Sequence, residues 1–87
     1  WELPLDDKFN SLLSSRVADL KNSGGRLAGA TTAAMFLKRF IKQSTPWIHL
    51  DIAGVSFRKD KTNLSPPGST GWGVRSLNFF VEKFYEK

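Results

Sequence analysis

The clearest hydrophobic pattern of the chain lies at Trp47–Val55. Ile48, Leu50 and Ile52 occupy every second position, a spacing that places side chains on one face of a β-strand. Most of the positions between them can also be buried, which is typical of a parallel sheet covered on both faces. We therefore predict a strand over residues 47–55, with helices packed on the sheet to which it belongs.

Three other segments show the apolar spacing of a helix. The first begins at the capping residue Asp6 and covers residues 6–15, the second covers residues 28–42, and the third covers residues 74–85. Pro46 closes the second region, because the residue before a proline is displaced from the α conformation. The apolar positions are Phe9, Leu12 and Leu13 in the first segment, Ala30, Ala33, Leu37, Phe40 and Ile41 in the second, and Val74, Leu77, Val81 and Phe84 in the third.

Two shorter segments and a loop complete the predicted order of elements. Trp1–Leu5 is predicted to be extended, and Val17–Lys21 fits a short strand. Residues 58–73 are rich in proline and glycine and predict a connection long enough to be either mobile or functional. The resulting order, β-α-β-α-β-loop-α, is of the α/β class. Three helices would cover so apolar a sheet poorly, so we expect further strands outside residues 1–87.

Composition narrows the class of protein. A chain of 87 residues suffices for one small domain, and its 40% hydrophobic content indicates a globular one. The absence of cysteine excludes disulfides and thiolate metal sites and suits a cytoplasmic protein. No apolar run reaches the roughly 20 residues that span a bilayer, so we expect no membrane partner. Because the chain begins at Trp1 inside a strand-like segment, we expect it to be a piece of a longer protein.

The net charge of +5 raises the possibility of a nucleic-acid partner. The basic residues are scattered, however, and Asp60 interrupts the second of their two groups. No recognised nucleic-acid-binding module is present. A solvated basic surface is therefore the favoured interpretation, and nucleic-acid binding is the alternative. The two groups are Lys38, Arg39 and Lys42 in the second helical segment and Arg58, Lys59 and Lys61 in the loop.

Two small-residue segments have a structural and a functional interpretation each. Ser23-Gly24-Gly25-Arg26 precedes a helix, so its N–H groups can cradle an anion or simply form a tight corner. The front of the following helix, Ala28–Ala34, carries no large side chain. Such a surface admits close packing, either within the chain or against a subunit or the core of an active-site domain. The sequence leaves both alternatives open.

The residues near the end of the predicted long strand are the candidates for chemistry. His49 and Asp51 would share one face of the strand, but two ligands leave a metal site underfilled, so a hydrogen-bonded histidine is favoured. No serine lies in a nucleophile elbow, and no acid–base triad is readable. Ala53 is small and lies where ligands collect at the carboxyl ends of strands, and Ser56 can line the same cavity. The alternative at this position is an ordinary turn after a strand.

Four blocks of sequence together resemble one known family. VADLKNSGGR, AGATTAAMFLKRF, WIHLDIAG and GSTGWGVRSL occur in order over nearly the whole chain. They resemble the C-terminal segment of the leucyl (cytosol) aminopeptidases, the M17 metallopeptidases. The resemblance implies that residues 1–87 are an incomplete piece of a catalytic domain, an α/β fold with a mixed or parallel sheet and helices packed on it. It also implies a cytoplasmic homo-hexamer that removes N-terminal residues such as leucine from peptides.

The resemblance further implies two divalent metal ions, zinc, manganese or magnesium, in the whole enzyme, which polarise the peptide carbonyl and supply a water nucleophile. The family's Asn-Thr-Asp-Ala-Glu-Gly-Arg motif is absent from this chain, so we assign no catalytic residue and no metal ligand to it. Asp19, Lys21, His49 and Asp51 are rejected for those roles.

One functional feature does carry over from the resemblance. In the family, the alanine of the Asp-Ile-Ala-Gly block and the residue three positions later help to wall the pocket for the substrate's first side chain. These positions are Ala53 and Ser56 here. Several relatives have methionine where this chain has Ser56, so a smaller and more polar wall predicts broader acceptance of side chains.

Overall fold

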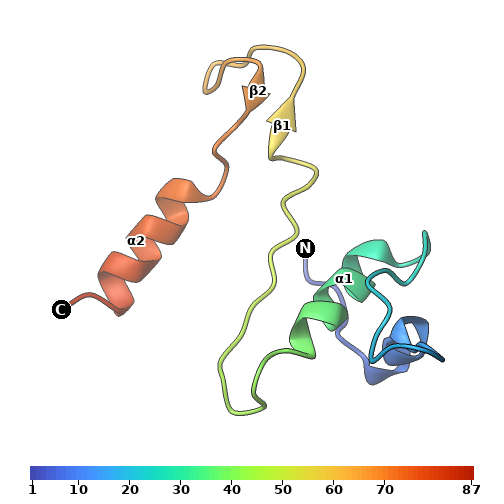
Figure 1. The fold of residues 1–87 in the computed structure, drawn as a ribbon. Helices are drawn as coiled ribbons and strands as arrows, with labels where there is room; N and C mark the ends of the chain where they lie inside the picture. Colours follow the sequence, from blue (N-terminus) through green and yellow to red (C-terminus); the bar gives the residue numbers. More distant parts are fainter. The chain divides into compact units, whose positions relative to one another are not determined.

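The computed structural model describes all of residues 1–87 as two compact units, Trp1–His49 and Leu50–Lys87. The first unit holds two helices and the second holds a two-stranded sheet and one helix (Figure 1). In chain order, the elements are the 3₁₀ helix η1 (Asp7–Leu13), the α-helix α1 (Gly29–Lys38), the strands β1 (Phe57–Arg58) and β2 (Gly68–Ser69), and the α-helix α2 (Val74–Phe84).

The first predicted helix is present as η1. Its capping residue is Asp6, whose carboxylate accepts a hydrogen bond of 2.8 Å from the Lys8 N–H. An acidic residue, Asp7, occupies the first turn, where its negative charge interacts favourably with the positive end of the helix dipole. The element ends at Leu13, whose side chain is fully buried. The predicted start is therefore confirmed, whereas the geometry is the tighter 3₁₀ form.

The second predicted helix is present as α1 but is shorter than residues 28–42. Ala28, just before the helix, has a φ of 53°, the left-handed conformation that is uncommon for a residue with a side chain. After Lys38 the backbone tightens, since the Phe40 N–H donates to the Leu37 carbonyl oxygen at 3.1 Å. The i to i−4 hydrogen bonds of the α-helix therefore end several residues before Pro46, the residue that was predicted to end the helix.

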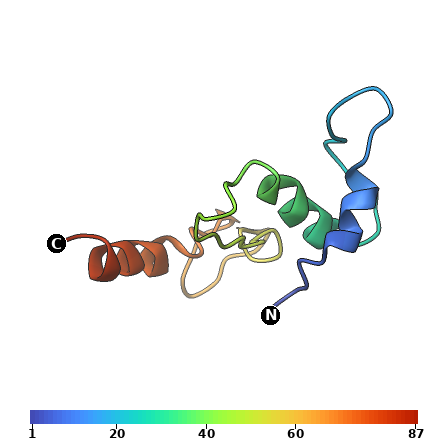
Figure 2. The ribbon, with the colours of Figure 1, turned by 90° about the horizontal axis from the view of Figure 1, so that it is seen from below.

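The buried face of α1 differs from the predicted apolar stripe. η1 packs against α1 in the first unit, and the two helices lie side by side in Figures 1 and 2. Three residues of the small front, Thr31, Thr32 and Ala34, are buried, whereas Phe40 of the predicted stripe is exposed. The buried residues of α1 are Thr31, Thr32, Ala34 and Met35.

The two short strands predicted in the first unit are absent. Trp1–Leu5 forms no strand, and Val17–Lys21 bends instead of extending. The Ser15 hydroxyl accepts hydrogen bonds from the Val17 and Ala18 N–H groups at 3.2 and 3.1 Å. A nearby hydroxyl thus occupies backbone donors that a ladder would need, and no neighbouring strand competes for them.

The predicted strand over residues 47–55 is also absent. The Asp51 carboxylate accepts a hydrogen bond of 3.0 Å from the Ala53 N–H. The N–H groups of Val55 and Ser56 both donate to the Ile52 carbonyl oxygen, at 3.0 and 2.9 Å. These bonds make a compact turn in the second half of the segment, and no part of residues 47–55 forms a strand, so the prediction was wrong. A strand buried in a parallel sheet needs paired neighbours on both sides, and residues 1–87 supply none to this segment.

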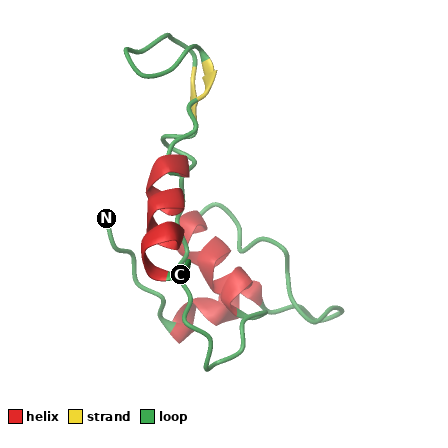
Figure 3. Ribbon diagram, turned by 90° about the vertical axis from the view of Figure 1, so that its left-hand side faces the viewer, coloured by secondary structure: helices red, strands yellow, loops and turns green.

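The predicted loop over residues 58–73 overlaps the sheet of the second unit, which begins at Phe57. β1 and β2 pair antiparallel, with Phe57 opposite Ser69 and Arg58 opposite Gly68 (yellow in Figure 3). Between the strands, the Thr62 N–H donates to the Ser65 carbonyl oxygen at 2.9 Å and closes a turn. The segment is therefore a hairpin with a structured loop.

The last predicted helix is confirmed to within one residue as α2 (Figure 3). Gly73 precedes it with a φ of 88°, a conformation that favours glycine, and accepts the first helical bond from the Leu77 N–H at 2.9 Å. No residue of α2 is buried, so its predicted apolar stripe is exposed in the second unit.

Helices and strands are thus both present, which is consistent with a piece of an α/β domain. The sheet that the structure describes has two short antiparallel strands. The larger mixed or parallel sheet stays a prediction.

Candidate functional site

The turn at residues 51–56 carries both predicted pocket residues. Ala53 is held by the bond from its N–H to the Asp51 carboxylate, and Ser56 by the bond from its N–H to the Ile52 carbonyl oxygen. Ala53 is exposed and Ser56 is half-buried. The structure therefore places the two residues in one turn of the second unit, not at the end of the predicted strand. Space beside Gly54 is open, since a Cβ atom there would meet nothing within 4 Å.

Thr70 attaches this turn to a distant part of the second unit. Its hydroxyl donates to the Val55 carbonyl oxygen at 2.6 Å, and its N–H donates to the Ser56 carbonyl oxygen at 2.9 Å. The same hydroxyl accepts a bond of 3.2 Å from the Trp72 N–H. Three hydrogen bonds of one residue thus join the turn at 51–56 to the corner that leads into α2.

Sequence reasoning did not single out Thr70. Its block, GSTGWGVRSL, contributed to the family resemblance, but no role was assigned to this threonine. The available signal was a hydroxyl residue between two glycines, because Gly68 and Gly71 on either side of it both adopt positive φ, 107° and 66°. Such a backbone corner is a place where a short polar side chain often bonds to neighbouring main-chain groups.

The arrangement at residues 51–56 suits binding better than bond cleavage. Ala53 offers a methyl group and Ser56 a small hydroxyl, so both leave room for a ligand side chain. Neither has a basic side chain within hydrogen-bond distance that would activate a nucleophile. The turn therefore holds no activated nucleophile.

The residues rejected as metal ligands occupy unrelated settings. Asp51 caps the turn described above, and the ring of His49 lies 6.0 Å from that of Trp47 in a tilted arrangement. Asp19 and Lys21 lie in the exposed bend after η1. The structure gathers no group of three histidine, cysteine, aspartate or glutamate side chains that could hold a metal ion.

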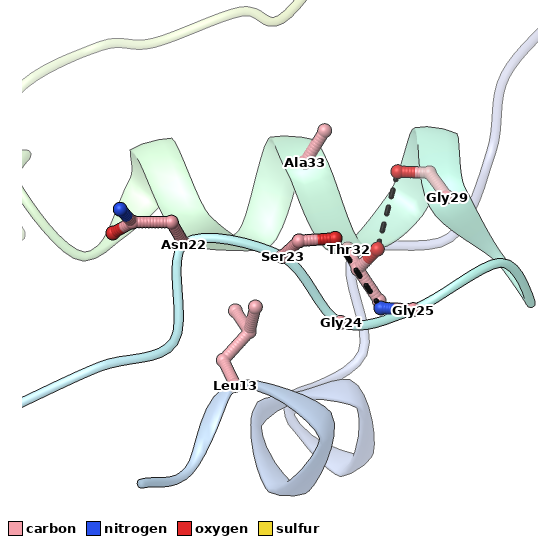
Figure 4. Close-up of a pocket in the computed structure, with 8 residues that line it drawn as sticks. All are labelled: Leu13, Asn22, Ser23, Gly24, Gly25, Gly29, Thr32 and Ala33. Carbon is pink, nitrogen blue, oxygen red and sulfur yellow. Dashed lines mark hydrogen bonds between the residues drawn. The ribbon is translucent and has the colours of Figure 1, made fainter. Parts of the chain in front are cut away.

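A shallow cavity of about 100 Å³ lies at the glycine corner of the first unit (Figure 4). The Gly25 N–H points to the Ser23 hydroxyl at 3.4 Å, so this donor already has a partner inside the corner. The Thr32 hydroxyl reaches back to the carbonyl oxygen of Gly29 at 3.1 Å. The geometry thus favours the structural interpretation of the corner over an anion cradle. The lining residues are Leu13, Asn22, Ser23, Gly24, Gly25, Gly29, Thr32 and Ala33.

Close packing explains the glycine at position 24. A Cβ atom added to Gly24 would lie 3.1 Å from the Thr32 methyl carbon and 3.3 Å from its hydroxyl oxygen. Thr32 is buried and belongs to the small front of α1. The small residues of that helix therefore serve contacts within the first unit, which is one of the two interpretations left open by the sequence.

Comparison with known proteins decides the family. A family model described as the cytosol aminopeptidase family, catalytic domain, matches residues 1–78. The chain belongs to the cytosol aminopeptidase family. This match covers nine-tenths of the chain and includes all four blocks on which the resemblance rests, so the resemblance is confirmed.

Individual members of the cytosol aminopeptidase family are similar over the whole chain. A probable cytosol aminopeptidase of Cereibacter sphaeroides is 52% identical over 87 residues, which are 100% of this chain and 18% of that protein. Proteins of the same name from Dinoroseobacter shibae and Chlamydia caviae are 51% and 50% identical, over 99% and 100% of this chain. The chain spans about 18% of the length of each of these relatives.

Proposed function

We propose that this chain is part of a metal-dependent aminopeptidase that releases N-terminal residues, leucine among others, from peptides in the cytoplasm. The observation that supports this most strongly is the match of residues 1–78 to the catalytic domain of the cytosol aminopeptidases. The names of the relatives agree with a peptidase. No helix has the length and hydropathy needed to cross a membrane.

In this proposal, Ala53 and Ser56 wall the pocket for the first side chain of the substrate. Both lie in one turn of the second unit, and the methyl and hydroxyl groups leave space beside them. A hydroxyl also tolerates the polar part of a long side chain better than an apolar wall does, because a polar group buried without a partner is costly. We therefore propose that the enzyme accepts longer and more polar residues beside leucine.

The two divalent ions that the family implies do not fit the residues of this chain. No three potential ligand side chains come together in the structure. When bound to the whole enzyme, such ions would polarise a carbonyl and activate a water molecule. We assign no step of that chemistry to residues 1–87, whose proposed contributions are scaffold and pocket wall.

The partner proposed for this chain is the remainder of its own catalytic domain, within a homo-hexamer of the whole enzyme. Its relatives are more than five times as long, and α2 leaves every one of its side chains unburied in the second unit. The nucleic-acid alternative is not favoured, because the matched family and the names of the relatives point to a peptidase.

Replacing Ser56 by methionine in the full-length aminopeptidase tests the pocket. We expect S56M to favour leucine and methionine substrates over arginine substrates by roughly tenfold in kcat/KM, since a few methylene groups in a pocket are worth this much. Ser69→Met in the exposed strand β2 is the matched control and should leave the ratio unchanged. Unchanged relative kcat/KM values in S56M would contradict the role of Ser56.

A further inference from the structure

The turn that carries the proposed pocket wall has two kinds of hydrogen bond. Within the turn, the bonds from Ala53, Val55 and Ser56 reach residues only two to four positions away. The bonds that leave the turn both come from Thr70, whose hydroxyl reaches the Val55 carbonyl oxygen across fifteen positions. The local bonds shape the turn, whereas Thr70 fixes where the turn lies in the second unit.

Thr70 is suited to this task by its chemistry. A hydroxyl donates one hydrogen bond and accepts others, and this one donates at 2.6 Å and accepts from the Trp72 N–H at 3.2 Å. Trp72 belongs to the corner that starts α2, between the positive-φ residues Gly71 and Gly73. Thr70 thus joins residues 55 and 56 by hydrogen bonds to the corner at Gly71–Gly73, whose backbone conformation is restricted.

We infer that Thr70 is a positioning residue that sets the width of the pocket for the substrate's first side chain. This inference rests on the proposed function, because the pocket wall is formed by Ala53 and Ser56. Loss of the hydroxyl would free the Val55 carbonyl while the Thr70 N–H bond to Ser56 persists. The wall would then shift or fluctuate without losing the hairpin register of β1 and β2.

The test compares Thr70→Val with Thr70→Ser in the full-length aminopeptidase. Valine keeps the shape of threonine and lacks both hydroxyl bonds, whereas serine keeps them. We expect T70V to raise KM for leucine substrates by about two- to tenfold, the value of the lost hydrogen bond to the Val55 carbonyl oxygen, with a much smaller change in kcat. Alanine substrates, whose side chain is too short to reach across the pocket, should change little. T70S should restore the wild-type preference for leucine over alanine.

Thr62→Val is the matched control. The Thr62 hydroxyl also accepts backbone bonds in a turn, from the Leu64 and Ser65 N–H groups at 3.2 and 3.0 Å, but it lies in the loop between β1 and β2. We expect T62V to leave the leucine-to-alanine ratio of kcat/KM at the wild-type value.

Two results would overturn the role of Thr70. One is an unchanged leucine-to-alanine ratio in T70V, and the other is an equal loss on both substrates, which a purely structural residue would give. Thr70→Ala removes the same hydroxyl and provides the same comparison if T70V yields no folded protein. A wild-type protein without aminopeptidase activity would contradict the proposed function itself, whereas an active wild type with an unaltered T70V contradicts only this inference.

Discussion

At the scale of single residues, short polar side chains and glycines determine the local structure. Asp6 and Asp51 each accept a hydrogen bond from a backbone N–H two positions ahead. The cap at Asp6 was predicted, whereas Asp51 was placed in a strand. The bonds of Thr70 were not predictable, since a contact across fifteen positions leaves no trace in local spacing. The assignment of Ala53 and Ser56 to a pocket came from family resemblance and stays a prediction, and the residue that hydrogen-bonds to their turn was not singled out.

Gly24 provides a residue-scale prediction. An alanine there would press a methyl group against Thr32, which cannot turn away freely because its hydroxyl is bonded to the carbonyl oxygens of Ala28 and Gly29. We expect Gly24→Ala to destabilise the full-length protein by about 1–3 kcal/mol, the usual cost of overpacking. Thermal unfolding would report it as a lower Tm.

The matched control for Gly24 is Gly29→Ala, because a Cβ atom at position 29 meets nothing within 4 Å. It should leave Tm unchanged or slightly raised, since alanine is the better helix former. Adding Thr32→Ser to Gly24→Ala removes the methyl carbon in closest contact and should recover part of the loss. An unchanged Tm in Gly24→Ala would contradict the packing described for this corner.

At the scale of elements, the helices were predicted and the strands were not. η1, α1 and α2 rest on local hydrogen bonds and nearby caps, which the sequence pattern contains. Strands need partners far along the chain, so the apolar run at Trp47–Val55 had the composition of a strand without a neighbour to pair with. The hairpin of β1 and β2 was missed for the opposite reason, because only two residues of each strand pair within a glycine- and proline-rich loop.

The apolar stripe of α2 allows a prediction at this scale. Leu77 belongs to the stripe and Asn78 is its neighbour, and both are exposed in the second unit. If the remainder of the catalytic domain covers the stripe, Leu77→Asp would bury a charge and should lower the Tm and soluble yield of the full-length protein. The control Asn78→Asp introduces the same charge and should have little effect. Equal effects of the two variants would contradict burial of this stripe.

At the scale of the whole molecule, few hydrophobic side chains of the chain are buried and many are exposed. Its buried hydrophobic residues are Leu13, Ala34 and Met35, all in the first unit. Large apolar side chains from Trp1 to Tyr85 remain exposed. Hydrophobic burial is the main stabilising term in folding, so a chain with this balance gains much by packing on more protein. Membership of a family whose members are several times longer gives this surface a natural partner.

We propose that this chain is part of an aminopeptidase. The most direct test is to digest one peptide, in two forms, with the full-length protein. The peptide begins with leucine and carries either a free or an acetylated amino terminus. We expect release of free leucine from the first form, followed in order by the residues behind it, and no release from the second. Equal cleavage of both forms, cleavage inside the peptide first, or no cleavage of either would contradict it.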